Sequence, residues 1–149
     1  MTLTLPVEET RRSLAEEEWS RPERAAGLPP VQMGLLGRAM ETSRHAVIVS
    51  THERDLILAA NPAACELLGY TREELLQTTP KMLSTRTDTE LAEVYDTLRE
   101  RSSAIRAEAR LRRRDGSLVT IGYWGSWVQV TGVDYLLTVT DPIENAREV

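Results

Sequence analysis

The sequence NPAACELLGYTREEL, which begins at Asn61, carries the strongest local signals of the 149-residue chain. Asn61 is a favoured helix N-cap and Pro62 suits the first helical position, so this pair predicts the start of a helix. Gly69 predicts its end, because glycine adopts the left-handed cap conformation at little cost. Thr71 and Glu74 then have the spacing of a capping box. We therefore expect two short helices separated by a tight turn.

Patterns on both sides of this stretch predict the remaining elements. Runs with β-rich composition and period-two alternation predict five strands, at residues 45–50, 56–60, 104–113, 118–130 and 134–140. Asp115-Gly116 and Gly132 predict the turns between the last three strands. A second capping box, Thr87 with Glu90, predicts the longest helix, which carries the apolar stripe Leu91, Val94, Tyr95 and Leu98.

This order of elements predicts an α+β fold, a five-stranded antiparallel sheet with short helices on one face. Residues 44–142 would form this domain. Residues 1–30 are interpreted as a charged tail or weak helix, and residues 31–43 as an N-terminal flanking helix. Asp141 and Pro142 have the types that open a helix, so residues 143–149 are expected to begin a C-terminal signalling helix.

Composition excludes several classes of function. The net charge of −5 argues against direct nucleic-acid binding, and a single cysteine rules out an internal disulfide. With two histidines and one cysteine, no metal site is expected. The longest uncharged run, residues 116–133, alternates like a strand, and the N-terminus lacks the apolar stretch of a secretory signal. We therefore expect a cytoplasmic protein that does not enter the membrane.

Three stretches resemble the PAS sensor domain family. Residues 58–75 are similar to the family's NPA…CELLGYTREEL signature, and LRRRDGS, residues 111–117, is similar to its RRKDGS hairpin. The third stretch is the last strand, which ends at Asp141. The resemblance covers about residues 40–142. It implies the PAS fold, in which the sheet cups a small cavity against its helices, and a role in sensing or protein interaction. It does not imply a particular ligand.

Two kinds of cofactor chemistry in this family can be tested on the residues. The flavin photosensors need a cysteine in a short helix where this chain has Pro80, and Cys65 on the preceding helix is interpreted as a small buried hydrophobe. The strand positions that contact flavin are the apolar Leu111, Ile121 and Val139, which disfavours flavin. Haem-binding members use a histidine on the long helix. That helix has none here, and His45 and His52 are interpreted as surface or edge residues.

Strand alternation and the helical stripes predict a set of inward residues that would line a core or a ligand pocket. The inward set also includes Leu83, Tyr95, Ala107, Ala109 and Val119, and the residues assigned to the pocket itself are Val47, Val49, Leu67, Leu75, Met82, Leu91, Val94, Leu98, Leu111, Ile121, Tyr123, Tyr135, Leu137 and Val139. Its only titratable groups are tyrosines, so we do not expect an enzyme. The set fits a pocket for a small apolar ligand, and a solid core is an equally good interpretation.

A second set of apolar residues is expected on the outer face of the sheet. If odd-numbered residues between Val119 and Gly125 point inward, then Trp124 points outward, and we expect Ile48 and Leu136 on the same outer face. An exposed apolar patch of this kind is typical of an interface. The helix at 31–43 could cover it from the same chain or from a second copy through its own stripe, so the expected dimer interface is Met33, Leu36, Met40, Ile48, Trp124 and Leu136.

The sequence as a whole predicts a PAS sensory and dimerisation module that acts in signal transduction or transcriptional regulation. It would form a homodimer and sense a small apolar ligand, with an effector domain or a separate signalling protein as its partner. The alternative is a sensor domain that carries non-covalent flavin or haem. The sequence does not name the cofactor, the ligand or the partner.

Overall fold

The computed structural model describes residues 30–149 except residues 52 and 102, with the side chains of residues 30–34 and 36 also left undescribed. The prediction for the tail therefore lies outside the described residues, apart from residue 30. The described elements are α2 (Pro30–Thr42), β1 (His45–Thr51), β2 (Leu56–Ala60), α3 (Pro62–Leu68), α4 (Arg72–Leu76), α5 (Pro80–Leu83), α6 (Asp88–Glu100), β3 (Ile105–Arg112), β4 (Leu118–Val130), β5 (Val133–Pro142), the 3-10 turn η3 (Ile143–Asn145) and β6 (Arg147–Glu148).

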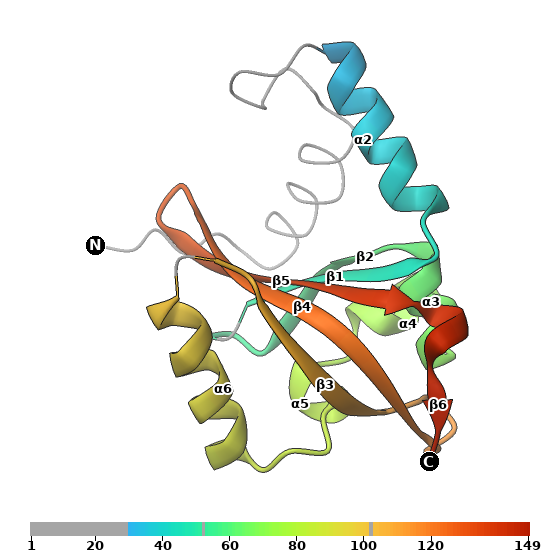
Figure 1. The fold of residues 1–149 in the computed structure, drawn as a ribbon, viewed down its shortest axis with the longest axis vertical. Helices are drawn as coiled ribbons and strands as arrows, with labels where there is room; N and C mark the ends of the chain where they lie inside the picture. Colours follow the sequence, from blue (N-terminus) through green and yellow to red (C-terminus); the bar gives the residue numbers. More distant parts are fainter. Residues whose placement is uncertain (1–29, 52, 102) are drawn as a thin grey trace.

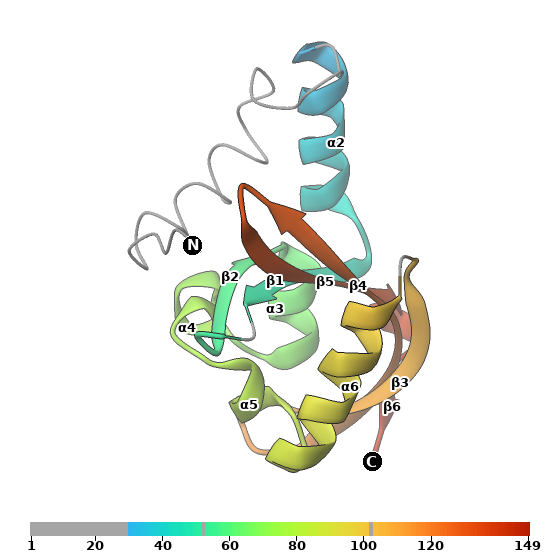
Figure 2. The ribbon, with the colours of Figure 1, turned by 90° about the vertical axis from the view of Figure 1, so that its left-hand side faces the viewer.

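The fold is α+β, as the sequence predicts. The five long strands form one antiparallel sheet in the order β2-β1-β5-β4-β3, and the short β6 pairs with β4. Helices α3 to α6 cover one face of this sheet, while α2 extends away from the body of the domain (Figures 1 and 2). No helix of the described part of the chain is long and apolar enough to cross a membrane.

The capping signals of residues 61–75 form as predicted. The Asn61 side chain accepts a hydrogen bond from the backbone N–H of Ala64, and Gly69 ends α3 with a φ of 79°. At α4 both hydrogen bonds of the capping box between Thr71 and Glu74 are present. These caps fix where α3 and α4 begin, so their leucines reach the main core: Leu68 and Leu75 are both fully buried there.

The C-terminal segment does not form the predicted helix. Residues 143–149 form a single 3-10 turn and then β6, which pairs with β4 at Val119 and Thr120. The pairing of β5 with β4 stops at Tyr123, so this part of β4 has an unpaired edge that the returning chain fills. Glu148 also forms an ion pair with Arg113, at 2.6 Å. Edge pairing therefore outweighs the local helix-start signal.

The strand register confirms the inward and outward residues predicted for β4 and corrects those predicted for β1 and β5. Val119, Ile121 and Tyr123 are buried on the inner face, and Trp124 points outward with 48% of its surface exposed. Trp124 pairs with Val139, however, and this places the odd-numbered residues of β5 on the outer face.

The same register carries over to β1. Val139 pairs with Val47 and Leu137 with Val49, and Tyr135 is on the same face of β5, so five residues assigned to the pocket lie on the outer face. Ile48 and Leu136, assigned to the dimer interface, lie on the inner face instead. Alternation separates the two sets within a strand, but only the pairing between strands decides which set is buried. In β5 the inner residues include Thr138 and Thr140, whereas the outer residues Tyr135, Leu137 and Val139 are all apolar, so the expectation that the more apolar set is buried gives the wrong face.

Candidate functional site

A cavity of about 120 Å³ lies between α6 and the inner face of the sheet. Six predicted pocket residues line it: Leu91, Val94, Leu98, Leu111, Ile121 and Tyr123. Further lining comes from residues outside the predicted pocket set, which are Ile48, Ser50, Ile57, Pro80, Leu83, Ser84, Arg86, Tyr95, Ala109, Leu136, Thr138 and Thr140. The even-numbered members from β1 and β5 follow from the corrected register.

Eight predicted pocket residues do not line this cavity. Val47, Val49, Tyr135, Leu137 and Val139 belong to strands whose register differs from the prediction. Leu67 and Leu75 are buried in the main core beneath α3 and α4, and Met82 is 56% exposed on α5. The helical stripe of α6 was assigned correctly because Leu91, Tyr95 and Leu98 form its buried face.

The lining of the cavity is apolar with a few hydroxyl groups. Ser50, Thr138 and Thr140 contribute hydroxyls from β1 and β5, and the Thr140 hydroxyl accepts a hydrogen bond from the backbone N–H of Ala46 at 2.8 Å. Burial raises the pKa of the Tyr95 phenol, which therefore keeps its proton at neutral pH. No carboxylate or histidine of the described residues lines the cavity.

Flavin and haem do not fit this cavity. Pockets for ligands of drug size or larger have volumes of roughly 300–1,000 Å³, more than twice the volume here. Pro80, at the position of the photosensors' cysteine, lines the cavity and offers no thiol. Cys65 lies on α3, packed against the main core, where burial raises the pKa of its thiol. α6 carries no histidine, and His45 is exposed at the start of β1.

Two open grooves adjoin the cavity, one between α6 and the edge strand β3 and the other between residues 84–86 and β3. One has a volume of about 390 Å³ and is lined by Val94 and Leu98 among others, and the other has about 310 Å³ and is lined by Ala109 and Leu111 among others. Arg86 borders both grooves as well as the cavity. The cavity therefore opens toward solvent beside this arginine.

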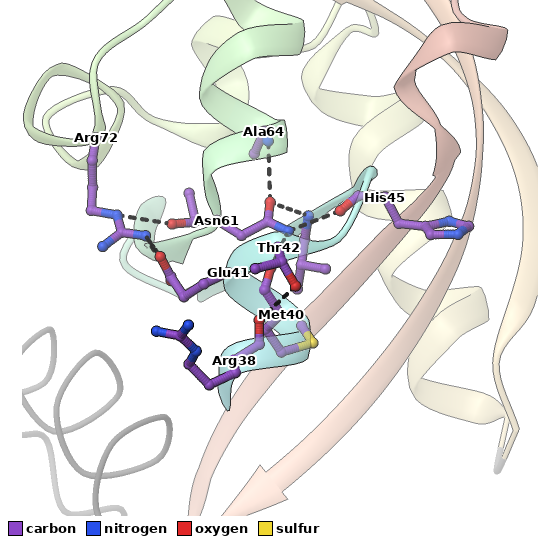
Figure 3. Close-up of polar contacts among 10 residues, drawn as sticks. Arg38, Met40, Glu41, Thr42, His45, Asn61, Ala64 and Arg72 are labelled. Carbon is purple, nitrogen blue, oxygen red and sulfur yellow. Dashed lines mark hydrogen bonds and ion pairs between the residues drawn. The ribbon is translucent and has the colours of Figure 1, made fainter. Parts of the chain in front are cut away.

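A polar junction joins α2 to the domain, and Asn61 is at its centre (Figure 3). The Asn61 side chain is fully buried and makes four hydrogen bonds to backbone groups. Its oxygen accepts from the N–H of Val47 at 2.9 Å and of Ala64 at 3.1 Å. Its amide nitrogen donates to the carbonyls of Met40 and His45, both at 2.8 Å. One side chain thus binds the end of α2, β1 and α3 together.

Two arginines reinforce this junction. Arg72 donates from Nε to the carbonyl of Ala60 at 3.1 Å, and its Nη2 contacts both carboxylate oxygens of Glu41 on α2 (Figure 3). Arg44 follows α2 and forms ion pairs with Glu66 on α3 and with Glu144 in η3. The segments that enter and leave the domain therefore meet at Arg44.

The outer face of the sheet presents Trp124 beside an ion pair. The Arg106 guanidinium lies 5.7 Å from the centre of the Trp124 ring and binds Asp141. A Cβ atom at Gly122 would collide with Asp141 and Arg106, so this glycine makes room for the pair on top of the strand. Val128, on the same face, is 38% exposed.

The predicted interface residues are therefore separated. Trp124 is on the outer face, whereas Ile48 and Leu136 line the cavity. Met40 is half-buried near the end of α2, and the side chains of Met33 and Leu36 lie outside the described residues. Leu35, which the prediction omitted, is 66% exposed on α2.

Known structures share this architecture. A PAS domain from a two-component sensor histidine kinase superposes with a TM-score of 0.61 at 15% identity and covers 80% of this chain and 97% of that chain. A domain of a sensory box sensor histidine kinase/response regulator from Geobacter sulfurreducens gives 0.63 at 20% identity, with 78% and 98% covered. The PAS domain of an HTR-like protein from Haloarcula marismortui gives 0.60 at 22% identity, with 80% and 93% covered.

These structural likenesses establish the fold, and a sequence match establishes the family. Residues 44–141 match the PAS domain family, so the chain belongs to it. A comparison with curated proteins found no match. PAS domains are sensory modules of signal-transduction proteins, and the chain is a member of this class.

Proposed function

We propose that this PAS domain senses a small apolar ligand in the cavity beneath α6 and acts without catalysis. The observation that carries the proposal is the apolar lining of the 120 Å³ cavity, to which Leu98, Leu111 and Ile121 contribute. An engineered cavity of about 150 Å³ with a similar lining binds benzene in another protein. A cavity of this size and chemistry therefore suits a ligand of about six carbon atoms.

The absence of catalysis is proposed from the groups at the cavity. General acid–base chemistry needs a side chain that exchanges a proton near neutral pH, and the tyrosines here are poor candidates. Burial raises the pKa of Tyr95 further from that range. No carboxylate among the described residues lies at the cavity wall to act in its place.

A ligand would act by shifting how α6 packs. This helix contacts the sheet through Leu91, Tyr95 and Leu98, and Trp127 and Leu136 pack against the same cluster. A ligand shifts this packing only if it binds one arrangement more tightly than another. We propose that the shift reaches an effector domain or a separate signalling protein, in signal transduction or transcriptional regulation, and that the protein acts in the cytoplasm without contacting nucleic acid directly.

Benzene tests the ligand proposal directly. We expect saturating benzene to raise the thermal unfolding midpoint by about 2–4 °C, the shift produced by ~1 kcal/mol in a domain of this size. Ala109→Leu fills the cavity and should abolish this shift. Ala104→Leu adds the same side chain at an exposed position before β3 and should preserve it. An equal benzene shift in both variants, or none in the unmodified protein, would contradict the proposal.

We further propose that the outer face of the sheet joins two copies of the chain. Trp124 and Val128 are exposed there, next to the half-buried outer residues Leu137 and Val139. The helix α2 projects from the body of the domain and carries the exposed Leu35 (Figure 2). A second copy can cover the patch with its own α2, and a two-fold arrangement would satisfy both copies equally.

Sedimentation equilibrium tests this homodimer. A tryptophan at the centre of an interface commonly dominates its binding energy, so Trp124→Glu should weaken dimerisation by about tenfold or more. Met82→Glu is the matched control, because Met82 is 56% exposed on the helical side of the sheet, on α5. If both variants dimerise equally, or if the unmodified chain is a monomer at high concentration, the dimer proposal is wrong.

A further inference from the structure

We propose that the ligand of this cavity is a small monocarboxylic acid, with its apolar chain in the cavity and its carboxylate bound to Arg86. The inference rests on the proposed apolar ligand and adds the charged group that would recognise it. Arg86 is the only cationic residue of the described chain that lines the cavity, and it also borders both open grooves. It therefore stands where a ligand inside the cavity would meet solvent.

The segment that carries Arg86 is held in place on the edge strand β3. Ser84 pairs with Leu111, and the Thr85 hydroxyl donates to the carbonyl of Arg110 at 2.9 Å. Nη2 of Arg86 donates to the carbonyl of Glu108 at 3.2 Å. These contacts fix the guanidinium at the cavity mouth before any ligand arrives, which reduces the entropy lost on binding.

Arg86 keeps binding capacity for an anion. A guanidinium has five N–H donors, and the described side-chain contact of Arg86 is a single bond to a neutral carbonyl. No carboxylate of the described residues forms an ion pair with it, in contrast to Arg44, Arg72 and Arg113. A carboxylate is the planar anion that this fork of donors binds best.

The acidic residues near Arg86 do not prevent an anion from binding to it. Glu90 and Glu93 border the groove on the α6 side, and both are exposed. The carboxylate of Glu90 accepts from the N–H of Thr87 in the capping box, so it is directed toward the start of α6. On the β3 side, Glu108 offers its backbone carbonyl to Arg86, while its carboxylate pairs with Arg147 at 2.7 Å.

Hexanoate and hexanol distinguish a carboxylate site from a purely apolar one, because they share a chain of about the right size. We expect hexanoate to bind the unmodified protein at least about tenfold more tightly than hexanol in calorimetric titration. Arg86→Gln should remove this preference. It should lower the affinity for hexanoate about 10–100-fold and leave the affinity for hexanol unchanged. Arg114→Gln is the control, because Arg114 pairs with Glu74 away from the cavity, and it should preserve the preference.

The outcomes separate this inference from the proposed function. Equal binding of hexanoate and hexanol would overturn the carboxylate inference alone, and no binding of either ligand would overturn both. If Arg86→Gln fails to fold, the salt dependence of the unmodified protein decides. Raising the ionic strength should lower the affinity for hexanoate and not the affinity for hexanol, because salt screens an exposed charge pair. Hexanoate binding that is insensitive to salt would then contradict a contact with Arg86.

Discussion

The cavity under α6 and the junction around Asn61 are packed in opposite ways. At the junction one fully buried amide satisfies four backbone groups, and Arg72 and Arg44 add further polar contacts. At the cavity, apolar side chains surround about 120 Å³ of space. A site whose polar groups are all paired has one good arrangement, whereas an underpacked apolar site tolerates several. The domain therefore combines an underpacked apolar cavity with a tightly hydrogen-bonded attachment for α2.

This difference suggests how a signal could cross the domain. In the proposed function α6 would adjust its position around a ligand, because its contact with the sheet surrounds empty space. The junction would then transmit the change as a rigid unit, because Asn61 and Arg72 tie α2 to the core. The following experiments test each half of this contrast.

The largest expected effect compares two buried leucines. Leu68 is fully buried in the main core at the end of α3, the helix that Asn61 begins, and Leu98 is 4% exposed beside the cavity. We expect Leu68→Ala to lower the free energy of unfolding by about 4 kcal/mol and Leu98→Ala by about 2–3 kcal/mol, because a loosely packed site loses fewer contacts. Urea denaturation measures both. Equal losses would mean that the two regions are equally well packed.

Asn61→Ala should be nearly as costly, at about 3 kcal/mol. The change leaves the backbone N–H groups of Val47 and Ala64 and the carbonyls of Met40 and His45 without this partner. Urea denaturation again provides the measurement.

The matched control for Asn61→Ala is Thr42→Ala, which removes an exposed hydroxyl bonded within α2 to the carbonyl of Arg38. It should change the free energy of unfolding by less than about 0.5 kcal/mol. A loss below about 1 kcal/mol for Asn61→Ala would show that Asn61 does not hold the junction together.

Acid should weaken the junction through Glu66. The hydrogen bond from Arg44 holds the pKa of Glu66 below its ordinary value of 4.5. The unfolded chain therefore binds this proton first, so the contribution of Glu66 is fully present above about pH 4.5 and is lost as pH falls through the lower folded pKa. Glu66→Gln should therefore lessen the loss of stability as the pH falls below about 4.5.

Urea midpoints at several pH values measure this slope. Glu93→Gln, a change on the exposed surface of α6, serves as the control and should leave the slope closer to that of the unmodified protein. If stability falls with pH at the same rate in Glu66→Gln and in the unmodified chain, the contact between Arg44 and Glu66 does not contribute to stability.

Local signals in the sequence predict most of the fold. Asn61, Thr71 and Thr87 each use their own side chain to begin a helix, so the residue type alone indicates the boundary. The turn at Asp115-Gly116 is similarly local, with a φ of 87° at the glycine. The family resemblance adds that these elements form one sheet that cups a cavity against its helices, and the strand order comes from the structure.

The candidate site was predicted less completely because it depends on long-range pairing. Alternation placed Ile121 and Tyr123 correctly, but the inner face of β5 depends on the pairing of Trp124 with Val139. Arg86 was also missed, because a charged residue in a connecting segment gives no periodic signal. Long-range contacts with β3, made by Ser84, Thr85 and Arg86, place it at the cavity mouth.

Native-state hydrogen exchange in the absence and presence of hexanoate tests the central contrast most directly. We expect the amides of Val47 and Ala64, which Asn61 binds, to exchange only when the whole domain unfolds. Amides of α6 should exchange through a smaller local opening, and hexanoate should slow this opening. If the amides of α6 exchange as slowly as that of Val47, or if hexanoate does not change their exchange, α6 does not pack around the cavity in the way we propose.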